Sequence, residues 1–176
     1  MITNKQTRII IENLTPEIDG GRFPIKRITS ERVIVTVDVF ADGHDAVWVN
    51  VLYRRPGDDL WKEVPLKHKG NDRWAAAFAV EEVGTYVYTV EGGVDCFTSW
   101  QKSLKKKFDA NQDIKVDVLT GVQYLEAASR TASADDKKTL LASVECLKTE
   151  AGRQRAASIA LSEELGALMN KYRDKK

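Results

Sequence analysis

Residues 33–40 read VIVTVDVF, with a valine at every second position. A period of two places alternate side chains on the same face of a strand, and β-branched residues favour strands. The same alternation recurs along the chain at 47–53, 86–90 and 114–118. Turn-forming residues separate these stretches at 41–45, 55–59, 69–72 and 92–93. Short strands broken by turns predict an immunoglobulin-like β-sandwich.

After residue 118 the apolar residues recur every three or four positions. Ser133 precedes two aspartates, which is typical of a helix N-terminus with a capping hydroxyl. Two apolar stripes follow, at Leu140, Leu141, Val144 and Leu147 and at Leu161, Leu165, Leu168 and Tyr172. We expect three amphipathic helices in a hairpin or small bundle, whose stripes pack either on the sandwich or on another chain. The predicted fold is therefore mainly β with a C-terminal α segment: a sandwich over 1–118 and helices over 119–176.

The composition of the 176 residues argues against several classes of partner. With 27 Lys and Arg against 26 Asp and Glu, the net charge of +1 gives no reason to expect nucleic acid or an anionic membrane. The longest apolar run is far too short to span a bilayer. Cys96 and Cys146 are expected to be buried thiols in a cytoplasmic protein, and His44 and His68 lack zinc-site spacing. We expect no metal and no cofactor.

The four tryptophans all fall in the predicted β part of the chain, at Trp48, Trp61, Trp74 and Trp100. Large aromatic rings dominate cores, so we expect them to fill the space between the two sheets. Trp48 and Trp61 are the candidates for another role, sugar stacking. Trp48 lies on the more polar side of its strand, and Trp61 borders an acidic turn.

Residues 16–27 read PEIDGGRFPIKR and cannot form a regular strand or helix. Gly20 and Gly21 allow positive φ, whereas Pro16 and Pro24 fix φ and remove two amide donors. A loop so strongly specified often docks on another surface, although a bulky turn between strands is an equal alternative. The candidate docking residues are Asp19, Gly20, Gly21, Arg22, Phe23, Pro24, Lys26 and Arg27.

No catalytic motif accompanies these features. The sequence contains no Walker loop, dinucleotide fingerprint or metalloprotease motif, and its two histidines lack a nucleophile motif. Asp42, His44 and Asp45 share one turn, where capping of backbone amides is the simpler interpretation. The lysine cluster at 102–107 is expected to be a solvated turn before the next strand. The residues alone therefore predict a non-catalytic sandwich with a helical appendage.

Six segments in order resemble the opening region of the α-1,4-glucan:maltose-1-phosphate maltosyltransferases, which belong to the α-amylase superfamily. The segments are PEIDGGRFPIKR (16–27), DVFADGHD (38–45), YRRP (53–56), GNDRW (70–74), GTYVYTVE (84–91) and DCFTSW (95–100). The resemblance runs over residues 9 to about 121, and the helical tail is similar in type only. It implies a bacterial enzyme that moves maltosyl units from maltose 1-phosphate to α-glucans with retention.

The family's catalytic carboxylates lie on a (β/α)₈ barrel, which needs about 200 residues or more and is not encoded here. The resemblance therefore implies an N-terminal sandwich with part or all of an inserted helical domain, cut from a longer chain. The first hypothesis is a non-catalytic accessory and dimerisation module, docked on the barrel through Phe23, Arg22, Lys26 and Arg27. The alternative is an independent α-glucan-binding module that uses Trp48 or Trp61. A free-standing enzyme is the third and least expected.

Overall fold

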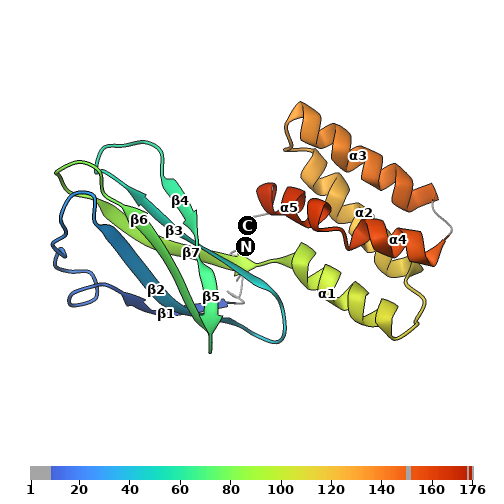
Figure 1. The fold of residues 1–176 in the computed structure, drawn as a ribbon, viewed down its shortest axis with the longest axis horizontal. Coiled ribbons are helices and arrows are strands. Elements are labelled where there is room, and N and C mark those ends of the chain that lie inside the picture. The colour runs from blue at the N-terminus through green and yellow to red at the C-terminus, as the bar shows by residue number, and fades with distance from the viewer. Residues whose placement is uncertain (1–8, 150–151, 174, 176) are drawn as a thin grey trace, which may run out of the picture. The chain divides into compact units, whose positions relative to one another are not determined.

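The computed structural model describes residues 9–149, 152–173 and 175, and divides into two compact units, Met1–Val94 and Asp95–Lys176. The described part of the first unit contains seven strands, and that of the second contains five helices (Figure 1). Each unit has its own cluster of buried apolar side chains. The chain is therefore a β-sandwich followed by C-terminal helices, as predicted.

The first unit is a sandwich of two antiparallel sheets. The four-stranded sheet has the order β1-β2-β6-β5 and the three-stranded sheet the order β4-β3-β7 (Figure 1). The first order corresponds to strands A, B, E and D of immunoglobulin-like domains. The strands are β1 (Ile9–Thr15), β2 (Arg32–Ala41), β3 (Val47–Arg54), β4 (Lys62–Pro65), β5 (Lys67–Gly70), β6 (Arg73–Ala79) and β7 (Val87–Val94).

Small β-branched side chains fill the space between the sheets. The alternate valines of β2 are buried, whereas Ile34 between them is exposed, so the predicted alternation is confirmed. They share a core with Val49 and Val51 of β3, and with Leu66 and Phe78. The expectation that tryptophans fill this core is wrong in its main part, because only Trp74 packs against the cluster and does so half-buried.

Two of the predicted turns have different outcomes. Asn71 and Asp72 join β5 to β6 with φ values of 47° and 61°, as a two-residue type I′ hairpin requires, so that turn is confirmed. Gly92 and Gly93 instead lie inside β7, and the turn predicted there is wrong. A Cβ on Gly93 would lie 2.8 Å from Nε1 of Trp48. These glycines therefore allow close approach of the indole and a neighbouring strand rather than a chain reversal.

The second unit consists of helices only. They are α1 (Cys96–Asp109), α2 (Lys115–Ser129), α3 (Ala134–Thr149), α4 (Arg153–Ala160) and α5 (Glu163–Lys171) (Figure 1). The cap predicted at Ser133 is confirmed, since its Oγ accepts from the amide of Asp136 at 3.4 Å. The second predicted stripe is divided between two helices, because Leu161 is the C-cap of α4 and Ser162 is the N-cap of α5.

The change from strand to helix comes at residues 94–96, not at 118 as predicted. The strand predicted over 114–118 and the turn predicted over 102–107 are both wrong, because these residues belong to α2 and α1 or lead into them. In α1, Phe97, Trp100 and Leu104 recur at helical spacing and are buried in the helical core. Trp100 therefore belongs to the helical unit, where its Nε1 donates to the carbonyl of Asp117 at 2.8 Å.

The cysteines also differ from expectation. Cys96 begins α1 and Cys146 lies in α3, and both are free and exposed rather than buried. Among the described residues, no helix is both long and apolar enough to cross a bilayer.

Candidate functional site

The loop between β1 and β2 carries the candidate docking residues. Asp19, Gly20 and Gly21 have φ values of 53°, 62° and 82°, so three successive residues adopt the left-handed conformation. This reversal brings the amide of Phe23 to 3.3 Å from the carbonyl of Ile18, where the two residues form an isolated bridge. The positive φ predicted for the glycines is confirmed, and the loop tip is a small, closed hairpin.

The tip presents an apolar ring beside a cation. The side chain of Phe23 is 52% exposed, and that of Ile18 is almost equally open. The guanidinium carbon of Arg22 lies 5.4 Å from the centre of the Phe23 ring, and Arg22 also pairs with Asp19 at 3.6 Å. Such exposed contacts contribute little to the stability of the chain itself. They leave an aromatic anchor with a cationic edge available to a partner.

Both ends of this loop are held by the sandwich. The Tyr88 hydroxyl on β7 donates to the carbonyl of Pro16, and the amide of Ser30 donates to the carbonyl of Val80 at 2.8 Å. Burial raises the pKa of Tyr88, the nearby Glu17 carboxylate raises it further, and Arg27 opposes both. The loop tip therefore projects from a base that hydrogen bonds hold at both ends.

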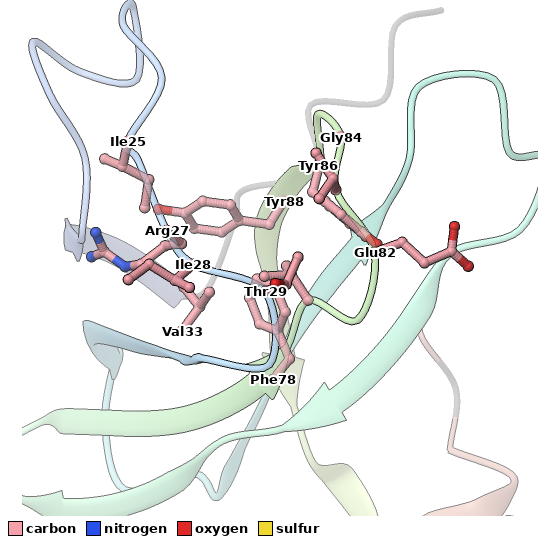
Figure 2. Close-up of a pocket in the computed structure, with 12 residues that line it drawn as sticks. Ile25, Arg27, Ile28, Thr29, Val33, Phe78, Glu82, Gly84, Tyr86 and Tyr88 are labelled. Carbon is pink, nitrogen blue, oxygen red and sulfur yellow. The ribbon is translucent and has the colours of Figure 1, made fainter.

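A cavity of about 390 Å³ opens beneath the base of the loop. Ile25, Arg27 and Ile28 reach it from the loop, and Glu82, Gly84 and Tyr86 from the segment before β7 (Figure 2). Its floor is apolar and aromatic: the Phe78 ring lies 5.9 Å from that of Tyr88. The rim exposes more apolar surface, with Ile28 75% and Val83 88% accessible. Sequence reasoning missed the segment at 81–86, because a short acidic loop with one valine matches no docking motif.

The eight candidate docking residues fall into two groups. Asp19, Gly20, Gly21, Arg22 and Phe23 form the tip described above. Pro24 and Lys26 lie exposed in the extended stretch towards the base, where the carbonyl of Lys26 accepts from Nη1 of Arg27 at 2.8 Å. Arg27 itself lines the cavity. The loop therefore joins an exposed aromatic tip to an apolar hollow on one side of the sandwich.

The two candidate sugar-stacking residues are placed differently. Trp48 on β3 is only 6% exposed, and its indole lies against Gly93, so little of its face is open to a ligand. Trp61 lies in the loop before β4 and is 37% exposed. The guanidinium carbon of Arg54 stands 4.4 Å from its ring centre. Of the pair, Trp61 is the one that keeps an accessible ring.

No group of three or more metal-ligating side chains gathers anywhere in the described residues. The charged pairs of the sandwich instead support its strands. Arg73 on β6 holds the Asp38 carboxylate of β2, to which Asn13 also donates at 2.9 Å. These hydrogen bonds, that of Asn13 foremost, lower the pKa of Asp38 against the effect of its burial. The arrangement ties β1, β2 and β6 together through their side chains.

Comparison with known proteins places these features in a family. A family model described as "Alpha-1,4-glucan:maltose-1-phosphate maltosyltransferase, domain N/S" matches residues 7–176. The maltosyltransferase of Chlorobaculum tepidum is 44% identical over 168 residues, which covers 96% of this chain and 25% of the relative. That of Myxococcus xanthus is 34% identical over 182 residues, covering 99% and 27%.

A third relative, from Methylacidiphilum infernorum, is 36% identical over 132 residues, with 73% of this chain and 20% of the relative covered. The chain thus spans about a quarter of the length of the curated relatives that it matches. The match begins before β1 and runs through all five described helices, so it includes the loop and both units. The chain belongs to the family of the α-1,4-glucan:maltose-1-phosphate maltosyltransferases, within their N/S domain region.

Proposed function

We propose that this chain is a non-catalytic accessory and dimerisation part of a cytoplasmic maltosyltransferase. The parent enzyme would transfer maltosyl units from maltose 1-phosphate to α-1,4-glucans with retention, in glycogen or α-glucan biosynthesis. Its catalytic carboxylates would lie on an α-amylase-type barrel outside these residues. The family membership of the chain, which covers only about a quarter of its relatives, supports this division of labour.

The observation that carries the docking role is the exposed, preformed tip at Phe23. A monomeric protein rarely gathers large apolar side chains on one surface without a partner for them. Here Phe23, Ile18, Ile28 and Val83 are all exposed around one loop and one cavity. We infer that this surface packs against the catalytic barrel of the parent chain, with Phe23 as the apolar anchor and Arg22, Lys26 and Arg27 as polar contacts.

Phe23→Ala in the full-length parent enzyme tests this role. Loss of a buried aromatic anchor typically costs several kcal/mol, about 3–5 for Phe→Ala in a core. We expect a lower melting temperature or a smaller dimer fraction, measured by calorimetry and by light scattering after size-exclusion chromatography. Trp61→Ala is the matched control, an exposed aromatic on another loop, and should change neither. An unchanged melting curve and an unchanged mass for Phe23→Ala would contradict the proposal.

A second measurement tests the non-catalytic assignment. The 176-residue chain incubated with maltose 1-phosphate and glycogen should release no phosphate, whereas the full-length enzyme should release it. Phosphate release by the chain alone would mean that it carries its own reactive groups, and the accessory role would then be wrong.

A further inference from the structure

A second, smaller cavity lies at the same end of the sandwich, separate from the loop tip. It has a volume of about 250 Å³ and is lined on one side by the end of β3, the β3–β4 connection and the start of β4, with Tyr53, Arg54, Arg55, Asp58 and Lys62. The end of β6 and the segment before β7 line the other side, with Ala79, Glu81, Glu82 and Tyr86. The size suits a short stretch of a longer ligand rather than a whole drug-sized molecule.

The charged side chains around this cavity balance, with Arg54, Arg55 and Lys62 against Asp58, Glu81 and Glu82. Arg55 binds Glu82 at 2.7 Å and donates through Nη2 to the carbonyl of Val83 at 3.3 Å. Arg54 donates to the carbonyl of Asp58 at 2.5 Å. An anionic ligand would have to compete with these carboxylates, and a cationic one with the guanidinium groups. A neutral ligand with many hydroxyl groups can use the remaining donors and acceptors without breaking the ion pair of Arg55 and Glu82.

An aromatic ring stands beside the cavity. Arg54, which lines it, also stacks on the indole of Trp61 at 4.4 Å, and Trp61 remains 37% exposed. This stack holds the ring in one orientation, so less conformational entropy is lost when a ligand packs on it. Tyr53 adds a second ring to the lining, stacked at 4.2 Å on Phe78 and approached by Nζ of Lys62 at 5.9 Å. Aromatic rings beside planar polar groups suit the apolar face and the hydroxyl edge of a pyranose.

We propose that this cavity and Trp61 together form a surface subsite for a neutral α-1,4-glucan chain. The choice of α-1,4-glucan among neutral carbohydrates rests on the proposed function, because the names of the relatives, α-1,4-glucan:maltose-1-phosphate maltosyltransferases, include that glucan. Glu82 and Tyr86 line both cavities, but Trp61 and Arg54 are separate from the loop tip at Phe23, so variants at these positions test the two roles apart.

The test is binding of maltoheptaose and glycogen by the 176-residue chain. Glycogen in a native gel should retard the chain, and calorimetric titration with maltoheptaose should give saturable binding. Trp61→Ala should abolish the retardation and weaken maltoheptaose binding roughly fivefold or more. Arg54→Lys, which keeps the charge but loses the planar stack, should weaken binding to a smaller degree. Phe23→Ala should bind as the unaltered chain does.

A folding control and several defined outcomes separate a true glucan subsite from its alternatives. Melting curves of all variants show whether they fold, and Arg54→Lys provides a second test of the site. Absence of retardation and of binding heat at millimolar maltoheptaose would overturn the subsite, as would equal binding by a folded Trp61→Ala chain. Displacement of the glucan by inorganic phosphate at constant ionic strength would indicate an anion site instead. None of these results bears on the melting and mass measurements that test docking.

Discussion

Two helical glycines show how much a single residue depends on its surroundings. Gly121 lies in α2, where an added Cβ would come within 2.2 Å of the Trp100 ring. Gly166 lies in α5, where the nearest atom to an added Cβ is Oε1 of Gln101 at 3.5 Å, an ordinary contact. The first glycine is therefore required by packing against a large ring, whereas the second is not.

Alanine at these two positions should change stability in opposite directions. Gly166→Ala should stabilise the chain by up to about 1 kcal/mol, the gain in helix propensity. Gly121→Ala should destabilise it by about 1–3 kcal/mol, because overpacking against Trp100 outweighs the same gain. Urea denaturation followed by far-ultraviolet circular dichroism measures both. A Gly121→Ala chain as stable as the unaltered one would show that the indole can move aside.

Asp136, at the start of α3, supports a pH-dependent prediction. Hydrogen bonds from Lys171 and Tyr172 on the α5 end, and from Ser133, lower the pKa of its carboxyl from 3.8 to about 2. The folded state therefore binds this proton less readily than the unfolded state. The stabilisation is fully present above about pH 5 and is lost as the pH falls from about 4 towards 2.

Asp136→Asn should lower the melting temperature at neutral pH, and the difference from the unaltered chain should shrink as the solution is acidified through that range. Melting curves over a pH series give the measurement. Asp135→Asn is the control, because Asp135 lies in the same first turn and its carboxylate forms no hydrogen bond or ion pair with the described residues. A melting difference for Asp136→Asn that stays constant down to about pH 2 would contradict the assigned interaction.

At the scale of an element, the β1–β2 loop is the segment on whose order the proposed docking depends. The hydrogen bonds and the ion pair at its tip join residues close in sequence, Ile18 with Phe23 and Asp19 with Arg22. Its attachment to the sandwich depends on hydrogen bonds at its ends, especially the one from Tyr88 to the carbonyl of Pro16. Loss of that bond should loosen the loop without unfolding the strands.

Tyr88→Phe should therefore cost about 0.5–1.5 kcal/mol and speed amide hydrogen exchange in residues 16–31. Mass spectrometry of exchanged peptides measures the loop, and denaturation measures the cost. Tyr53→Phe is the control, because the Tyr53 ring stacks on the same Phe78 while its hydroxyl forms no hydrogen bond with the described residues. Equal exchange in both variants would show that the Tyr88 hydroxyl does not anchor the loop.

At the scale of the whole molecule, the decisive feature is the division at Val94 and Asp95. The helical core includes Phe97, Trp100 and Leu104 from α1, and the Asp95 side chain caps that helix by accepting from the amide of Thr98 at 2.8 Å. A division at residue 118 would remove α1 and cut α2. Each unit as divided has a core of its own.

The fragment of residues 95–176 should therefore fold alone with a helical spectrum and cooperative thermal unfolding. The fragment of residues 119–176 should not, because losing three large core side chains at ~3–5 kcal/mol each exceeds what a small domain can spare. Circular dichroism of the two fragments makes the comparison. Cooperative unfolding of 119–176 with similar stability would favour the border at 118.

Local patterns in the sequence determined the structural features that depend only on residues close along the chain. Short-range geometry explains the valines of β2, the turn at Asn71 and Asp72, and the cap at Ser133, so the sequence alone predicts each of them. The left-handed loop at Gly20 and Gly21 belongs with them. The family resemblance carried by the ordered motifs also needed no structure, and it is confirmed.

Only the tertiary structure decided the features that depend on packing against residues distant in sequence. The alternation at 114–118 is equally compatible with a strand, and it becomes helical because Val118 packs beside Trp100 in the helical core. Gly92 and Gly93 resemble a turn until the Trp48 ring is seen against the strand. Likewise, the two cavities exist because loops far apart along the chain meet at one end of the sandwich. Pattern fixes local conformation, whereas the identity of the packing partner depends on how the whole chain closes.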